Sequence, residues 1–248
     1  MKIFLFYFLI FGIVIELIGG FESFSFEKCN YSDAQCPIKL LQFFIDQFWC
    51  GNEELDLPHL DPLRVNEATL VSQGKGPLNY IFHIRDFDFI GYRECRIIHT
   101  AGWSKEFDGT DAEIVLKAPK FTITGPFTIK GNFLRFLIEG SGISNVTLSN
   151  VDARMKFKLK KVTKDGKVYA TVDKFMVKIT TTRMYMHLEN IFDGDAMLKE
   201  IVDQFIDENW EMIFKDIEPS AMKTFGKIWQ DIFNHILSRI PYGEFFND

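Results

Sequence analysis

Apolar residues between Ala196 and Ile240 recur at intervals of three and four residues, which is the spacing of an α-helix. The pattern predicts two long helices, separated at Glu218-Pro219 because proline lacks the backbone N–H that a helix interior uses. In each helix the apolar positions cover roughly half of the circumference, whereas about 100° suffices for a helix that lies on one sheet. Such helices are covered from more than one side, so we expect a sheet that curls around them.

Between about Arg64 and Leu188 apolar positions alternate with polar ones, which is the period of a half-buried strand. The clearest stretch is 151–159, where Val, Ala, Met, Phe and Leu alternate with Asp, Arg and Lys. One apolar face and one charged face indicate an antiparallel sheet. Asp165-Gly166 then supplies the residue types of a two-residue hairpin turn.

The alternation changes phase at three places, and each change predicts a β-bulge that bends a strand. These places are Asp86, Pro119-Lys120 and Asp173-Lys174. The hairpin turn and the third bulge together predict three cross-strand pairs, namely Leu159 with Val172, Phe157 with Phe175, and Met155 with Val177. Long strands with such bends indicate a curved sheet.

A shorter helical pattern begins near Pro37 and ends at about Trp49. Leu55–Leu63 is expected to be extended, because each proline there disfavours the helical region for the residue before it. No linker rich in Pro, Gly or Ser divides the chain. We therefore predict an α+β fold, with a strongly curved antiparallel β-sheet wrapped around a long C-terminal helix and with an N-terminal helix. It forms a single domain over residues 26–248.

The N-terminus has the form of a secretory signal peptide, because Lys2 precedes an uncharged apolar run from Ile3 to Ile15. The run is shorter than the roughly 18 residues of a transmembrane helix, and no basic cluster follows it. We predict a signal peptide over residues 1–20, cleaved between residues 20 and 25. The protein is therefore expected to be secreted and extracellular.

A secreted chain can form disulfides, and four cysteines are present: Cys29, Cys36, Cys50 and Cys95. Cys29 and Cys36 flank a short polar loop and are expected to pair first. Cys50 and Cys95 then either pair or remain as two buried free thiols. Asn30 and Asn145 begin N-glycosylation sequons, which are used only in the secretory pathway.

No catalytic motif accompanies these features. The histidines lack the H-x-x-x-H and H-E-x-x-H spacings of zinc sites, and neither C-x-x-C nor G-x-S-x-G occurs. Asp86 and Asp88 are better explained as solvent-facing strand residues at a bulge than as a metal site. We predict a protein that is not an enzyme and that needs no metal or other cofactor, although catalytic triads assemble in space rather than in sequence.

Four groups of residues match a known family in the order in which they occur. They are Cys29 with Cys36; Leu55-Asp56-Leu57-Pro58 with Leu60-Asp61-Pro62-Leu63; Gly125-Pro126-Phe127 through Gly140-Ser141-Gly142 into Asn145-Val146-Thr147-Leu148; and Asn190-Ile191-Phe192-Asp193-Gly194 with Asn209-Trp210 and Phe225-Gly226-Lys227. In these residues the chain resembles the takeout / juvenile hormone-binding family of secreted insect proteins. The fold of that family is related to that of bactericidal/permeability-increasing protein.

The resemblance implies a long helix wrapped by a curved sheet, an apolar tunnel that holds a lipid-like ligand, and a Cys29–Cys36 disulfide. Two features depart from the family pattern. Thr124-Gly125-Pro126-Phe127 stands where the family often has an aromatic-Gly pair. No cysteine follows Cys95, whereas hormone-binding members carry a later disulfide. The second departure favours a takeout-like protein over a true juvenile hormone carrier.

We assign the tunnel wall to large apolar residues of the predicted helices and of one strand, namely Phe44, Phe157, Ile206, Trp210, Phe214, Phe225, Trp229 and Phe233. Core and tunnel wall have the same composition, so plain core explains any single one of them equally well.

The predicted function is a secreted carrier of a small hydrophobic ligand, such as juvenile hormone, a fatty acid or another terpenoid or lipid. The alternative is a secreted signalling protein that acts through its surface on a receptor protein and requires no ligand. The chain has a formal net charge of −6 and no basic stripe, which argues against nucleic acid and anionic lipid as partners. Stable membrane insertion is not expected either.

Overall fold

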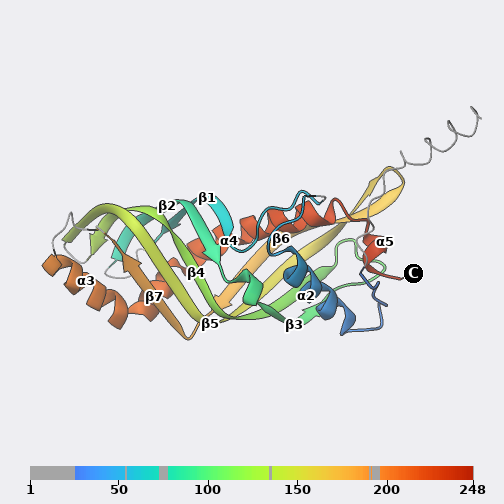
Figure 1. Ribbon diagram of the computed structural model, residues 1–248, viewed down its shortest axis with the longest axis horizontal. Coiled ribbons are helices and arrows are strands. Elements are labelled where there is room, and N and C mark those ends of the chain that lie inside the picture. Colours follow the sequence, from blue (N-terminus) through green and yellow to red (C-terminus); the bar gives the residue numbers. More distant parts are fainter. Residues whose placement is uncertain are drawn as a thin grey trace, which may run out of the picture.

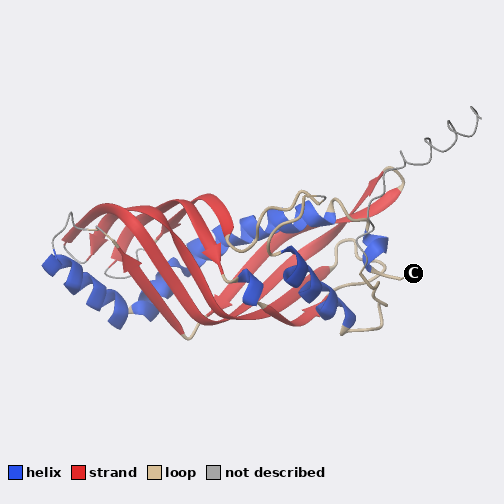
Figure 2. Cartoon of the chain, in the orientation of Figure 1, coloured by secondary structure: helices blue, strands red, loops and turns tan. Residues whose placement is uncertain are grey.

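The computed structural model describes residues 26–53, 55–72, 78–133, 136–189, 191 and 196–247. The expected signal peptide, residues 1–20 with cleavage between residues 20 and 25, lies outside this range. The molecule is elongated, and a long helix runs beside a strongly curved sheet (Figures 1 and 2).

Within the described residues, seven strands form one antiparallel sheet in the order β1-β2-β4-β5-β6, with β3 also paired to β4 and β7 to β5. The strands are β1 Leu63–Val71, β2 Leu78–Ile90, β3 Arg96–Ala101, β4 Asp111–Phe133, β5 Phe136–Lys164, β6 Lys167–Thr180 and β7 Arg183–Leu188. The helices are α2 Cys36–Phe48, the 3₁₀ turn η1 Tyr92–Glu94, α3 Ala196–Glu208, α4 Trp210–Leu237 and α5 Tyr242–Phe245. The predicted α+β fold with a curved sheet around a long C-terminal helix is confirmed.

The two longest strands, β4 and β5, pair with each other, and in both of them the buried side of the strand changes at the same paired positions. Ala118 pairs with Val151 just before this change and Phe121 pairs with Leu148 just after it, counted along β4, and all four side chains are buried. Pro119-Lys120 between them is exposed. The pairing stays in register, so the bulge predicted at Pro119-Lys120 is wrong. Both strands change phase together, and neither gains an extra residue.

The same paired positions divide the shorter strands. Asn150 on β5 has a φ of 50°. Opposite it, β6 gives way to β7 through Thr181 and Thr182, whose hydroxyls donate to the carbonyl of Ser149 at 2.7 and 3.2 Å. On the other side of β4, β2 gives way to β3 through η1. The sheet therefore has two halves, one with β1, β2 and β7 and one with β3 and β6, and only β4 and β5 cross both.

The other two predicted bulges are confirmed. Asp86, with a φ of 44°, lies at the register shift between β2 and β4, and Lys174, with a φ of 52°, lies at the shift between β5 and β6. The first bulge brings Phe87 so close to Gly125 that a Cβ at residue 125 would lie 2.6 Å from that of Phe87. The predicted pairs also form, since Leu159 lies opposite Val172, Met155 lies opposite Val177, and the rings of Phe157 and Phe175 stack at 5.3 Å.

The C-terminal helices separate at Asn209, not at Glu218-Pro219 as predicted. Pro219 lies inside α4, where it cannot donate to the carbonyl of Lys215. One stripe of α4 is nevertheless buried along its length, and it consists of Ile213, Ile217, Ala221, Phe225 and Trp229. Burying these side chains stabilises the continuous helix by more than the roughly 3 kcal/mol that an internal proline costs.

The expectation that both helices are covered from more than one side is wrong for α3 within the described residues. Ile206 is buried, whereas Met197 is 74% exposed and Ile201 is 54% exposed. The reason is position, because α3 lies at one end of the molecule and meets the sheet only through its inner side (Figure 1).

At the N-terminal side, α2 begins at Cys36, next to Pro37, as predicted. Cys29 and Cys36 form a disulfide with their Cα atoms 5.4 Å apart. Cys50 and Cys95 are free, and Cys95 is buried whereas Cys50 is exposed. Of the two outcomes left open for this pair, the structure has free thiols, but only one of them is in the core.

The segment Leu55–Leu63 is less extended than predicted. Asp56 has a φ of 49° and lies in a turn that is closed by backbone pairing between Asn52 and Leu57. A second turn follows at Asp61-Pro62. The first turn directs Asp56 toward the C-terminal end of α4.

Candidate ligand-binding cavities

The half of the sheet with β1, β2 and β7 encloses an apolar cavity, here cavity 1, against α3 and α4. Its volume is about 120 Å³. Alternate positions of the strands supply one wall, as with Phe82 and Ile84 on β2, and Phe205 and Phe214 supply the helical wall. Among the residues that line cavity 1, only Glu218 carries a charge. The apolar side chains of the strands and those of the helices thus face the same space.

The other half of the molecule contains cavity 2, with a volume of about 100 Å³. Its walls come from α2, from the inner face of β3 and β4, from the second half of α4 and from α5. Large residues dominate them, including Phe44, Trp103, Phe233 and Tyr242. Cavity 2 is therefore also suited to an apolar ligand.

Aromatic rings separate the cavities. Phe225 lines cavity 1, and Trp229, one turn further along α4, lines cavity 2. The ring of Phe89 on β2 lies 5.6 Å from that of Phe225 and 6.4 Å from that of Trp229. Tyr92, in η1, lies 5.0 Å from Trp229. These four rings, here the aromatic boundary, lie where β2 ends and the buried side of the sheet changes.

Six of the eight residues assigned to the tunnel wall line these cavities. They are Ile206, Phe214 and Phe225 in cavity 1, and Phe44, Trp229 and Phe233 in cavity 2. The remaining two lie elsewhere. Phe157 is buried in a stack with Phe175. Trp210 is half-buried at the start of α4 and packs against the edge of the core, with the guanidinium of Arg183 5.6 Å from its ring centroid.

The sequence analysis missed most of the sheet side of both cavities. Phe82 and Phe89 belong to the alternating apolar face of residues 78–90, and that alternation could have identified them. Trp103 lies in a loop and Tyr242 lies in a helix of four residues, where no periodicity marks the inner side. Only the folded chain brings these two side chains to cavity 2.

The C-terminal segment covers the end of cavity 2. Tyr242 and Phe245 line it. The amide of Cys29 donates to the carbonyl of Phe245 at 2.9 Å, and the amide of Asn247 donates to the carbonyl of Cys29, also at 2.9 Å. Because Cys29 is bonded to Cys36 at the start of α2, the disulfide holds α2 and α5 together over this cavity.

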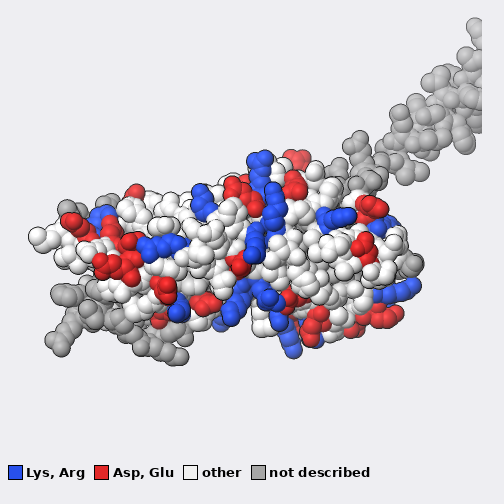
Figure 3. Space-filling view, turned by 90° about the horizontal axis from the view of Figure 1, so that it is seen from below, with Lys and Arg blue, Asp and Glu red and all other residues white. Residues whose placement is uncertain are grey.

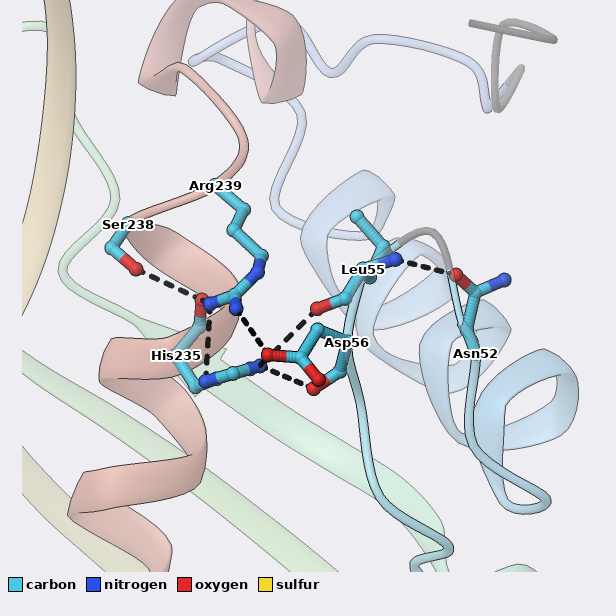
Figure 4. Close-up of polar contacts among 6 residues, drawn as sticks. All are labelled: Asn52, Leu55, Asp56, His235, Ser238 and Arg239. Atoms are coloured by element: carbon cyan, nitrogen blue, oxygen red, sulfur yellow. Dashed lines mark hydrogen bonds and ion pairs between the residues drawn. The ribbon is translucent and has the colours of Figure 1, made fainter.

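A polar cluster, here the His235 cluster, attaches the loop before β1 to the end of α4 (Figure 4). Nε2 of His235 lies 2.5 Å from the carbonyl oxygen of Asp56 and 3.2 Å from that of Leu55. Arg239 donates to Nδ1 of His235 at 3.1 Å and to the carboxylate of Asp56 at 2.6 Å. A neutral imidazole with its proton on Nε2 satisfies all of these contacts.

The His235 cluster supports the wall of cavity 2 from outside. Leu55 and Leu57 in the attached loop are buried with Phe48, and Phe44 and Ile236 pack against them. Phe44 and Ile236 also line cavity 2. The hydrogen bonds of His235 therefore hold the loop in place, and the loop in turn packs against residues that line cavity 2.

Titratable groups near the boundary are held uncharged. Burial raises the pKa of Cys95 to about 12, and the carboxylate of Asp61 adds to this effect. Burial also raises the pKa of Tyr92.

Among the described residues, no three His, Cys, Asp or Glu side chains lie together as metal ligands. In the same part of the chain, no helix combines the length and the apolar character needed to span a bilayer.

Known proteins share this fold. The profile of the haemolymph juvenile hormone binding protein family matches residues 8–247. The circadian clock-controlled protein daywake of Drosophila yakuba and that of Drosophila melanogaster are each 20% identical over 236 residues, which cover 94% of this chain and 90% of the relative. The crystal structure of Epiphyas postvittana Takeout 1 superposes with a TM-score of 0.79 at 20% identity, covering 90% of this chain and 100% of the other.

Proposed function

Because the chain belongs to the haemolymph juvenile hormone binding protein family, we propose that it is a secreted carrier that holds a small hydrophobic ligand inside its curved sheet. The ligand is juvenile hormone, a fatty acid or another terpenoid or lipid. Residues 1–20 act as the signal peptide, and residues 26–248 form the mature single domain.

Cavity 1 is the observation that carries this proposal. Its volume of about 120 Å³ lies among side chains of which only Glu218 is charged. An engineered apolar cavity of about 150 Å³ in another protein stays free of water and binds benzene. An apolar group that enters cavity 1 leaves water and gains contacts with walls that have no competing polar partner.

An elongated ligand needs both cavities, since each alone has room only for a group of small-ring size. A chain of about 15 methylenes gains roughly 12 kcal/mol on burial at about 0.8 kcal/mol each. Association itself costs on the order of 4–15 kcal/mol. The gain exceeds the association cost over most of that range, so we expect a chain to bind across both cavities once the rings of the aromatic boundary move apart enough for it to pass.

Native mass spectrometry of the purified protein, with organic extraction of any bound molecule, tests the proposal. We expect a co-purifying lipid, and we expect the extracted protein to take up a fluorescent fatty-acid probe. A protein that is repeatedly empty and indifferent to the probe contradicts the carrier function and favours a signalling protein that acts through its surface.

A pair of variants links the probe to the cavities. Ala221 is buried on α4 and lines cavity 1, so Ala221→Phe fills that space and should weaken probe binding. Leu159→Ala is the control, because Leu159 is buried and lines neither cavity. It should lower the melting temperature and leave the probe affinity of the folded protein unchanged.

A further inference from the structure

The hairpin of β5 and β6 extends beyond the body of the molecule. Backbone pairing continues to Lys164 opposite Lys167, and both residues of the Asp165-Gly166 turn have positive φ, 51° and 74°. Residues 160–167, here the hairpin tip, are exposed at every position. A strand that still packed on the core would bury every second residue. Both faces of the tip are therefore in solvent (Figure 1).

The hairpin tip is basic in an acidic protein. Four lysines and one aspartate give it a net charge of +3, or +2 when Lys160 is counted with its partner Asp173, whereas the whole chain has −6. At the base of the hairpin the lysines have acidic partners, as with Lys158 and Asp111 at 2.8 Å and Lys160 and Asp173 at 2.7 Å. Lys161, Lys164 and Lys167 form no ion pair with any described residue. The positive charge thus concentrates at the end of the ribbon.

The opposite end of the molecule is acidic. On α3, Lys199 is the single basic residue against four acidic ones, Glu200, Asp203, Asp207 and Glu208. This helix and the hairpin tip lie at opposite ends of the long axis (Figure 1), and acidic side chains gather toward the α3 end on the face shown in Figure 3. Such a charge separation orients the protein with the hairpin toward a negative surface.

The net charge of the whole chain argues against anionic lipid as a partner, but that sum does not describe the local charge of the hairpin tip. We propose that the hairpin tip docks the protein on an anionic membrane surface. Val162 is 43% exposed and lies opposite Tyr169, on the same face as Lys160 and Lys164. An apolar and an aromatic side chain at this place reach the interfacial layer while the lysine ammonium groups meet the headgroups. Lysine carries a point charge on a flexible stem, which suits a diffuse layer of lipid headgroups. Recognition of one carboxylate on a protein favours the planar fork of arginine, and the tip has none.

Docking by the tip brings cavity 2 toward the bilayer. The strand that forms the tip also carries Met155, whose side chain lines cavity 2. If the protein is a carrier, this orientation places the end covered by α5 near the source or the destination of the ligand. The docking surface itself does not require a ligand, so vesicle binding and probe binding fail or succeed independently.

Co-sedimentation with vesicles tests the proposal. The mature protein should bind phosphatidylcholine vesicles that contain phosphatidylserine, should release from them as salt rises, and should not bind vesicles of phosphatidylcholine alone. Each lysine near an anionic bilayer contributes roughly fivefold to partitioning. The triple variant Lys161→Gln, Lys164→Gln, Lys167→Gln should therefore lose about 100-fold in binding.

The matched control removes the same charge from exposed lysines of α4, in the triple variant Lys215→Gln, Lys223→Gln, Lys227→Gln. It should retain most of the vesicle binding. Equal losses in the two triple variants overturn the proposal, because the effect then reflects net charge alone. Absence of vesicle binding by the unmodified protein also overturns it, and binding of soluble polyglutamate in its place assigns the tip to an acidic protein partner.

Discussion

The indole of Trp229 on α4 stands nearly perpendicular to the ring of Phe89 on β2, with an interplanar angle of 82° and ring centroids 6.4 Å apart. Phe89 lines cavity 1 and Trp229 lines cavity 2, so this edge contact is part of the wall between the two spaces. A ligand that fills both cavities has to separate these rings. For the proposed carrier, we expect this contact to limit the length of ligand that the interior accepts.

Trp229→Phe should shift binding toward longer ligands. The smaller ring widens the passage, and each further methylene that becomes buried is worth about 0.8 kcal/mol, or roughly fourfold in affinity. Competition with fatty acids of increasing chain length measures the shift. Trp210→Phe is the control, because the half-buried Trp210 lines neither of the two cavities. The same length dependence in both variants would show that the boundary does not limit the ligand.

His235→Ala should loosen the loop before β1. The substitution leaves the carbonyls of Leu55 and Asp56 without a side-chain donor, and losing such hydrogen bonds costs about 1–2 kcal/mol in the free energy of unfolding. We expect earlier proteolytic cleavage near residues 51–62, measured by limited proteolysis with peptide mapping. His99→Ala, at an exposed position on β3, should leave the cleavage pattern unchanged. An identical pattern in both variants contradicts a holding role for His235.

The two free cysteines should differ in reactivity. Cys50 is exposed and should be alkylated in the folded protein at neutral pH. Cys95 should react only after unfolding, because burial raises the pKa of its thiol to about 12. Mass spectrometry after iodoacetamide treatment, with and without denaturant, distinguishes the two sites. Alkylation of Cys95 in the folded state at the rate of Cys50 would contradict its burial.

The pKa of Cys95 also predicts a loss of stability in alkaline solution. The folded state holds the thiol proton more tightly than the unfolded state, so the contribution to stability is complete below the unfolded pKa of about 9. It declines as pH rises from there toward about 12. Cys95→Ala should remove this part of the alkaline destabilisation, measured by urea unfolding at a series of pH values. An unchanged pH profile in Cys95→Ala assigns the alkaline effect to other groups.

Removal of the Cys29–Cys36 disulfide should release the cover of cavity 2. For a loop of this length the chain-entropy estimate gives about 2.5 kcal/mol of stabilisation. The double variant Cys29→Ser, Cys36→Ser should unfold at lower urea, and hydrogen exchange of the Phe245 to Asn247 segment should become faster. Cys50→Ser should change neither measurement. Non-reducing peptide mapping that joined Cys29 to Cys50 or Cys95 would contradict the pairing itself.

Local patterns determined much of the fold. The alternation over residues 151–159 and the Asp165-Gly166 turn identified the β5–β6 hairpin and its pairs, because strand facing and turn type depend on neighbouring residues. Pro37 marked the start of α2 for the same reason, and the order of the motifs indicated the family. These features required no knowledge of distant contacts.

Tertiary structure decided between alternatives that the local sequence pattern does not distinguish. Pro219 indicated a helix break, but the buried stripe from Ile213 to Trp229 keeps α4 continuous because its contacts with the sheet stabilise more than the proline costs. Trp210 and Trp229 have the same side chain and similar apolar neighbours in the sequence, yet Trp229 is buried and lines cavity 2, whereas Trp210 is half-buried and lines neither cavity 1 nor cavity 2. Packing against Phe89, a residue 140 positions away, makes that difference. Core, cavity wall and surface are properties of which residues meet in space, and hydrophobicity along the chain does not contain them.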